Sequence, residues 1–232
     1  MESLTQHAVV QTLDQQVPDW LPSESNRSNL APEIVFTKDN MAVWTWLVSK
    51  GITNALRGLS QMMGHEIKVT SLDLKWLPAK DVAGLLGGLD TVSVGIYLKI
   101  EGDATGHLLL MHEPRIAFQL IDLQLELPQG STQQIGEMER SVLGEMGNVT
   151  GSFFLNALAD TTNLVLMPSP PAVIVDMVGA IMNIPLTLIM AEQDDALVVK
   201  AVFSAANQQI DGTFMVLPTM DFMRTILKHQ RT

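Results

Sequence analysis

Three polar side chains near the middle of the sequence have types and spacing that could bind a shared partner through hydrogen bonds and one negative charge. Ser141, Glu145 and Asn148 stand at i, i+4 and i+7, so a helix would place them on one narrow face. The amide of Asn148 offers an acceptor and a donor without a charge. The carboxylate of Glu145 can form a charge-assisted hydrogen bond with a lysine. An ordinary solvent-facing helix presents the same stripe, so these residues alone leave both interpretations open.

Two other stripes run along the same predicted helix. An apolar stripe almost opposite the polar one is expected to face the core: Val142, Met146, Val149 and Phe153. A bare stripe lies beside the polar one: Gly144, Gly147 and Gly151. Each glycine costs a helix about 1 kcal/mol relative to alanine. That cost predicts that another backbone comes close on this side.

The complete pattern resembles the signature of the CheC/CheX/FliY phosphatases of bacterial chemotaxis. Ser141-x3-Glu145-x2-Asn148 is followed, after 22 residues, by Pro171. The flanking segments 157–160 and 173–177 also fit the family. A bare Glu-x2-Asn arises by chance in many chains, whereas four fixed positions in a matching context form a specific signal.

The resemblance implies an activity and a role for each residue. Members of this family remove the phosphoryl group from the response regulator CheY, so the chain is expected to be a protein aspartyl-phosphate phosphatase (a hydrolase). Glu145 would dock on and orient a lysine of the phosphorylated CheY-like partner, and Asn148 would position the attacking water. The partner would supply Mg²⁺, so the chain is expected to need no cofactor of its own.

The remaining positions of the signature are expected to face the partner. Ser141 stands where the family has Asp or Ser, and Pro171 is expected to shape the corner beside the helix. The stripe of Gly144, Gly147 and Gly151 would let the partner's active-site loops approach. Asp176 corresponds to the place where family members contact a second partner, CheD, through a short helix. A solvated or capping aspartate explains Asp176 equally well.

The first half of the chain resembles the family less. Trp46, Ser49 and Leu72 stand where a second signature would have Glu, Asn and Pro. We therefore expect the first half to be an inert scaffold. The competing interpretation is a non-catalytic module that binds response regulators or acts as a scaffold, related to the middle domain of FliM. Exposure of Glu145 and Asn148 on one accessible face would favour the phosphatase.

Composition excludes several classes of function. The formal net charge of -11 argues against nucleic acid as a partner. The chain has no cysteine, which excludes disulfides and thiol nucleophiles and is compatible with a cytoplasmic location. The apolar region 164–190 contains Pro168, Pro171 and Pro185, so we expect no insertion into a membrane.

An internal repeat sets the expected architecture. Residues 106–121 match residues 212–227 at a shift of 106 positions, with apolar residues coinciding. We predict an α+β fold in which a tandem pseudo-twofold duplication packs long helices on a mostly antiparallel sheet. Residues 1–38 would be a polar, acidic extension, and 39–232 one domain with halves 39–127 and 128–232.

Patterning also predicts the elements. Helices are expected at 41–63, capped by Asp39-Asn40, and at 79–86, 114–125, 132–160, 175–181 and 220–230. Strands are expected at 65–74, 91–100, 107–111 and 213–217, near Leu164, and two or three times between 185 and 203.

Overall fold

The computed structural model describes residues 38–205 and 208–229, so the expected N-terminal extension lies outside it except for Lys38. The helices are α2 (Lys38–Met63), η2 (a 3-10 helix, Ala79–Leu86), α3 (Pro114–Gln124), α4 (Glu137–Thr162), α5 (Val178–Met190) and α6 (Met220–His229). The strands are β1 (Ile67–Pro78), β2 (Val92–Gly102), β3 (Gly106–His112), β4 (Leu166–Pro168), β5 (Ala172–Met177), β6 (Asp195–Ala205) and β7 (Gln208–Pro218).

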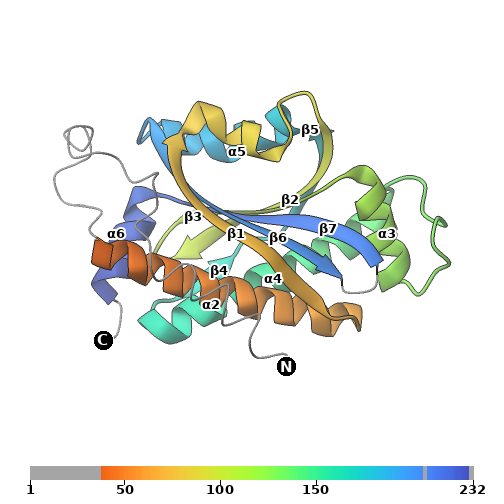
Figure 1. The fold of residues 1–232 in the computed structure, drawn as a ribbon, viewed down its shortest axis with the longest axis horizontal. Coiled ribbons are helices and arrows are strands. Elements are labelled where there is room, and N and C mark those ends of the chain that lie inside the picture. Colours follow the sequence, from red (N-terminus) through yellow and green to blue (C-terminus); the bar gives the residue numbers. More distant parts are fainter. Residues whose placement is uncertain (1–37, 206–207, 230–232) are drawn as a thin grey trace.

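All these strands form one sheet between two layers of helices (Figure 1). The order is β1-β6-β7-β3-β2-β4, with β5 also on β2, and every pairing is antiparallel. The long helices α2 and α4 lie side by side on one face, and α5 covers the other (Figure 1). The predicted α+β class with an antiparallel sheet is confirmed.

The sheet carries the symmetry that the repeat predicts. In the central pair of strands Leu109 on β3 faces Met215 on β7, and these are also the residues that the 106-position shift superposes. A pseudo-twofold axis therefore passes between them. The outer strands are exchanged across this axis: β1 pairs with β6 of the second half, and β5 pairs with β2 of the first half.

Two apolar layers hold the sheet. The larger one lies under the long helices, where Trp44 of α2 packs against Phe222, and Phe154 of α4 packs against Phe214. The smaller one lies under α5 and η2 and includes Ile181. Burying side chains on both faces explains why β3 is buried along its whole length.

The first long helix agrees with its prediction except at its start. Its apolar stripe is buried throughout: Leu47, Ile52, Leu56, Leu59 and Met63. Gly64 ends the helix with φ +66, in the left-handed region that glycine adopts at low cost. The predicted cap at Asp39-Asn40 is wrong, because α2 already begins at Lys38.

The second long helix begins five residues later than predicted, at Glu137 rather than near Thr132. The preceding loop is tied to a carboxylate instead. Asp122 of α3 is buried and accepts hydrogen bonds from the backbone N–H groups of Gly130, Ser131 and Thr132. Burial alone would raise the pKa of Asp122, but these bonds to the charged form hold it below its ordinary value. Segment 130–132 therefore cannot join the helix.

The prediction for residues 172–203 is the least accurate. The helix expected at 175–181 exists but begins three residues later, at Val178, and runs to Met190 as α5. The prediction of two or three strands between 185 and 203 is wrong, since the rest of α5 and the single strand β6 occupy this region. Residues 172–177 find hydrogen-bonding partners on the free edge of β2. Pro185 lies inside α5 and is buried with Leu186 and Ile189 against the sheet, where apolar burial offsets the backbone bond that proline cannot make.

Candidate functional site

The polar stripe of α4 lies on the solvent side of a firmly held helix. Ser141, Glu145 and Asn148 are all exposed, whereas Leu143 and Met146 between them are fully buried. The two buried side chains fix the rotation of the helix on the sheet. The three polar side chains therefore point into solvent from one face of the helix.

Neither Glu145 nor Asn148 is used internally. In residues 38–205 and 208–229 neither side chain forms a hydrogen bond or an ion pair. The amide of Asn148 thus keeps its full donor and acceptor capacity, and the carboxylate of Glu145 remains available to a cation. This satisfies the criterion that separates a reactive face from an inward-bonded one.

The core-facing stripe is shifted from its predicted position. Met146 is buried as expected, but Val142, Val149 and Phe153 are only partly buried. The face that meets the sheet is instead centred on Leu143, Met146, Thr150, Phe154 and Leu158. The predicted stripe lies toward α2, where Phe153 fills the space beside Gly58.

The bare stripe does allow a close approach, but the nearest atoms belong to side chains of the chain's own sheet and not, as predicted, to a backbone. A Cβ on Gly147 would collide with Ile96 Cγ2 of β2, and one on Gly151 would lie 3.3 Å from Leu98 Cδ2. Both glycines are buried. The prediction that they admit a partner's loops is therefore wrong. Gly144 is half-buried, so it alone of the three reaches the surface beside the polar stripe.

Pro171 packs against the same flank of α4. It lies 3.6 Å from the Cβ position of Gly144 and 3.5 Å from that of Gly147. The turn that carries it is anchored to β2 by Ser169, whose N–H donates to the Lys99 carbonyl while its Oγ accepts from the Lys99 N–H (both 2.9 Å). Pro171 thus shapes the rim beside Asn148. No pattern in the sequence indicated that Ser169 anchors this rim.

A second residue that the sequence interpretation missed lies at the start of α4. Arg140 is exposed, and its Nη1 donates to the carbonyl of Val173 on β5 at 2.7 Å. It is one turn before Gly144 and two turns before Asn148, on the flank of the helix that Pro171 borders. An arginine in a first turn that otherwise carries Glu137 and Glu139 was the available signal.

Asp176 lies in β5, opposite Ser93 of β2, and not in the short helix where it was expected. Its exposed carboxylate accepts from the backbone N–H of Met177 at 2.7 Å. Helix α5 begins only after it, at Val178. Any role of Asp176 in binding a partner stays a prediction.

The corresponding face of α2 is chemically different. Trp46, in the place of the glutamate, is 52% exposed and has Lys50 Nζ 5.2 Å above its ring. Lys50 Nζ also donates to Thr161 Oγ1 at 2.9 Å. Ser49, in the place of the asparagine, has a buried Oγ without a hydrogen-bond partner in the described part of the chain. Leu72, in the place of the proline, is half-buried.

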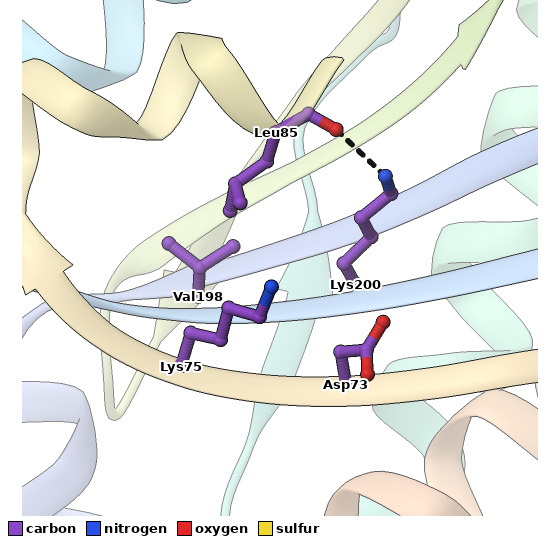
Figure 2. Close-up of a pocket in the computed structure, with 5 residues that line it drawn as sticks. All are labelled: Asp73, Lys75, Leu85, Val198 and Lys200. Carbon is purple, nitrogen blue, oxygen red and sulfur yellow. Dashed lines mark hydrogen bonds between the residues drawn. The ribbon is translucent and has the colours of Figure 1, made fainter. Parts of the chain in front are cut away.

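The hollow in Figure 2 is too small for a substrate. It measures about 40 Å³, lies between β1, β6 and η2, and is lined by Asp73, Lys75, Leu85, Val198 and Lys200. Lys200 Nζ is bonded to the Leu85 carbonyl at 2.6 Å (Figure 2). Among the residues described, no three His, Cys, Asp or Glu side chains form a metal-binding group. None of the described helices has the length and apolar character to cross a bilayer.

The buried histidine of β3 belongs to the core. His107 Nδ1 and the Tyr97 hydroxyl are 2.9 Å apart in the layer under α5. Burial, assisted by the positive charge of Lys99, lowers the pKa of His107 to about 4. His107 is therefore neutral at physiological pH and lies on the opposite side of the sheet from α4.

Comparison with known proteins identifies the family of this site. Residues 138–175, from the start of α4 to β5, match the model of the CheC-like family. The chain is also 30% identical over 175 residues to the CheY-P phosphatase CheC of Bacillus subtilis (strain 168), an alignment that covers 74% of this chain and 84% of that protein.

Solved structures share the fold at lower identity. FliY of Thermotoga maritima matches with a TM-score of 0.66 and 16% identity, over 84% of this chain and 98% of that one. A chain of the CheX-CheY-BeF3-Mg²⁺ complex of Borrelia burgdorferi matches with a TM-score of 0.53 and 13% identity, over 75% of this chain and 97% of that one. A chain of the FliM-SpeE complex of H. pylori matches with a TM-score of 0.57 and 14% identity, over 84% of this chain and 96% of that one. These likenesses establish the fold.

Proposed function

The chain belongs to the CheC-like family, and we propose that it accelerates hydrolysis of the aspartyl phosphate on a CheY-like response regulator. The observation that carries the proposal is the paired exposure of Glu145 and Asn148 on one face of α4, with no internal partner among the described residues. The relative in Bacillus subtilis with 30% identity is a CheY-P phosphatase.

The shape of the site supports a protein substrate. Small-molecule sites are usually concave, whereas Glu145 and Asn148 project from the outer surface of a helix. An aspartyl phosphate on a second protein lies in that protein's own pocket, so a projecting helix can reach it. The long buried face of α4 holds both side chains in position for this insertion.

The roles follow from the chemistry of an acyl phosphate, which already hydrolyses slowly in water. Asn148 accepts a hydrogen bond from the attacking water and orients it in line with the phosphorus–oxygen bond, without adding charge near the phosphoryl oxygens. Glu145 pairs with a lysine of the regulator and fixes the docking. The water attacks phosphorus and the bond to the aspartyl oxygen breaks, which regenerates the aspartate carboxylate on the regulator. Inorganic phosphate leaves, and the proton of the water passes to the phosphate or to solvent.

The metal ion would belong to the partner. Within the described residues this chain offers no cluster of metal ligands, and the proposed roles of Glu145 and Asn148 require none. Mg²⁺ bound by the regulator would neutralise the phosphoryl oxygens. Reaction would then take place in the cytoplasm, where such regulators act.

The test measures phosphate loss directly. CheY-like regulators of the host genome, phosphorylated and supplied with Mg²⁺, are mixed with the protein or with its Asn148→Ala variant, and the remaining phosphoryl group is followed. Faster loss with the parent protein alone supports the proposal. Binding of a regulator without faster loss would instead favour the scaffold function proposed by analogy with FliM.

A CheD-like protein is a second proposed partner. The supporting observation is that two apolar side chains of the edge strand β5, Val175 and Met177, are exposed beside Asp176 in the sequence. Co-purification with a CheD-like protein, lost on Val175→Lys, would support this partner. Equal recovery with the variant would exclude this surface.

A further inference from the structure

We propose that Arg140 orients the phosphorylated partner, by offering its guanidinium to an anionic group at the edge of the partner's phosphorylation site. This inference rests on the proposed function and extends it to a residue outside the signature. It assigns docking to one flank of α4, the flank formed by Arg140, Gly144 and Pro171.

The position of Arg140 is electrostatically unfavourable for the helix itself. Helix N-termini carry a partial positive charge, which favours acidic side chains in the first turn and disfavours basic ones. Glu137 and Glu139 follow this rule, but Arg140 does not. Arg140 lies in the first turn of the helix, where its backbone N–H donates to the Gly136 carbonyl. No other base occurs along α4. Helix stability therefore gives no reason for an arginine here.

The guanidinium is held in place but not neutralised. Its Nη1 donates to the Val173 carbonyl at 2.7 Å, which draws the side chain across to β5. In the described part of the chain Arg140 forms no ion pair. A guanidinium has five N–H donors in a planar fork, so one bond to a carbonyl leaves a charged, oriented face free.

The surface between Arg140 and Asn148 is bare. The two residues stand at i and i+8 on one flank of α4, and Gly144 lies midway between them at i+4. A Cβ at Gly144 would touch only Pro171, at 3.6 Å. A partner loop lying over Gly144 would thus meet the amide of Asn148 at one end and the guanidinium at the other.

The charge of the partner's site fits this arrangement. An aspartyl phosphate with the carboxylates that hold Mg²⁺ is an anionic region, and this chain carries a formal net charge of -11. Two acidic surfaces repel each other, and a local cation at the rim restores attraction and sets orientation. Because Arg140 is two turns from Asn148, it acts on docking and not on the attacking water.

The experiment compares two charge-neutralising variants. Arg140→Gln and Arg57→Gln each remove one exposed arginine, and Arg57 lies on α2, where its Nη2 bonds to Asn54 Oδ1. We expect Arg140→Gln to raise the KM for the phosphorylated regulator about tenfold at low salt with kcat unchanged, and Arg57→Gln to leave both near the parent values. The difference should shrink as ionic strength rises.

A binding measurement separates this inference from the proposed function. Affinity is measured for the panel of CheY-like regulators loaded with beryllofluoride and Mg²⁺, and the tightest binder is used. Affinity that Arg140→Gln lowers and Arg140→Lys partly restores supports the inference, even if the parent protein releases no phosphate. Equal affinity of the parent and both glutamine variants overturns it, as does an equal loss in both.

Thermal unfolding tests whether the role of Arg140 is purely structural. If Arg140 only fastens α4 to β5, Arg140→Gln lowers Tm and leaves KM, affinity and their salt dependence at the parent values. That result would also overturn the inference.

Discussion

The two long helices, α2 and α4, are related by the pseudo-twofold axis, yet only α4 carries the exposed Glu–Asn pair that we propose acts on the phosphoryl group. On α4 the outward positions hold Glu145 and Asn148, and on α2 the same positions hold Trp46 and Ser49. Trp46 has Lys50 Nζ over its ring, and the hydroxyl of Ser49 is buried. A duplicated scaffold thus keeps its packing in both halves, while its chemistry depends on two or three side chains.

The largest effect is expected at Asn148. If its amide orients the attacking water, its contribution appears mainly in the transition state. Asn148→Ala should then lower single-turnover phosphate loss by about 10²-fold and leave affinity for a beryllofluoride-loaded regulator unchanged. Asn148→Asp keeps the size and an acceptor but adds a negative charge, so it should lower single-turnover phosphate loss as well.

Affinity that falls in step with the rate would make Asn148 a docking residue. A full rate in Asn148→Ala would remove the proposed difference between the two helices.

A smaller loss is expected at Glu145. Glu145→Ala should raise the concentration of phosphorylated regulator needed for half-maximal rate about tenfold, because a charge-assisted bond to the partner's lysine is lost. An exposed helical Glu→Ala change is nearly neutral for folding, so Tm should not move. Titration of the rate with the phosphorylated regulator measures the effect. Unchanged dephosphorylation would contradict the assigned role.

The glycine flank allows a matched test of packing. Gly147→Ala introduces a methyl group against Ile96 and should destabilise the protein by about 1–3 kcal/mol, less the helix propensity it gains. Gly144→Ala meets only ordinary contact with Pro171 and should leave the free energy of unfolding unchanged or raise it. Urea unfolding of both variants measures the difference. Equal stability would mean that Gly147 is not needed for the approach of β2 to α4.

The smallest effect is expected on α2. Ser49→Ala removes a buried hydroxyl that has no hydrogen-bond partner in the described residues, so neither turnover nor Tm should fall. Loss of phosphatase activity in a folded Ser49→Ala protein would place chemistry on the first half and end the contrast between the helices.

Sequence patterning predicted the site better than the path of the chain after it. Exposure of Glu145 and Asn148 follows from helical periodicity, and the 106-position repeat predicted the central register of Leu109 with Met215. The glycine stripe correctly indicated a close approach, but periodicity cannot say what approaches. Here it is the side chains of β2, and not the backbone of a partner.

The errors after Pro171 have a tertiary cause. Residues 172–177 become a strand only because β2 has a free edge beside them, which no local pattern records. Pro185 is tolerated inside α5 because the helix lies buried on the sheet. The anchoring bonds of Asp122, Ser169 and Arg140 were also absent from the predictions, since each joins residues that meet only in the folded chain.

The exchange of outer strands has a consequence for the order in which the protein folds as it is synthesised. Among the described strands, β1 pairs only with β6, more than a hundred residues later, and β2 completes its second edge with β5. Closing such long loops is slow and must precede the contacts that reward it. A nascent chain that has emerged as far as α3 therefore carries β1 without its partner, an exposed edge that invites association with other chains. The sheet of the first half is therefore completed only when the second half has been synthesised.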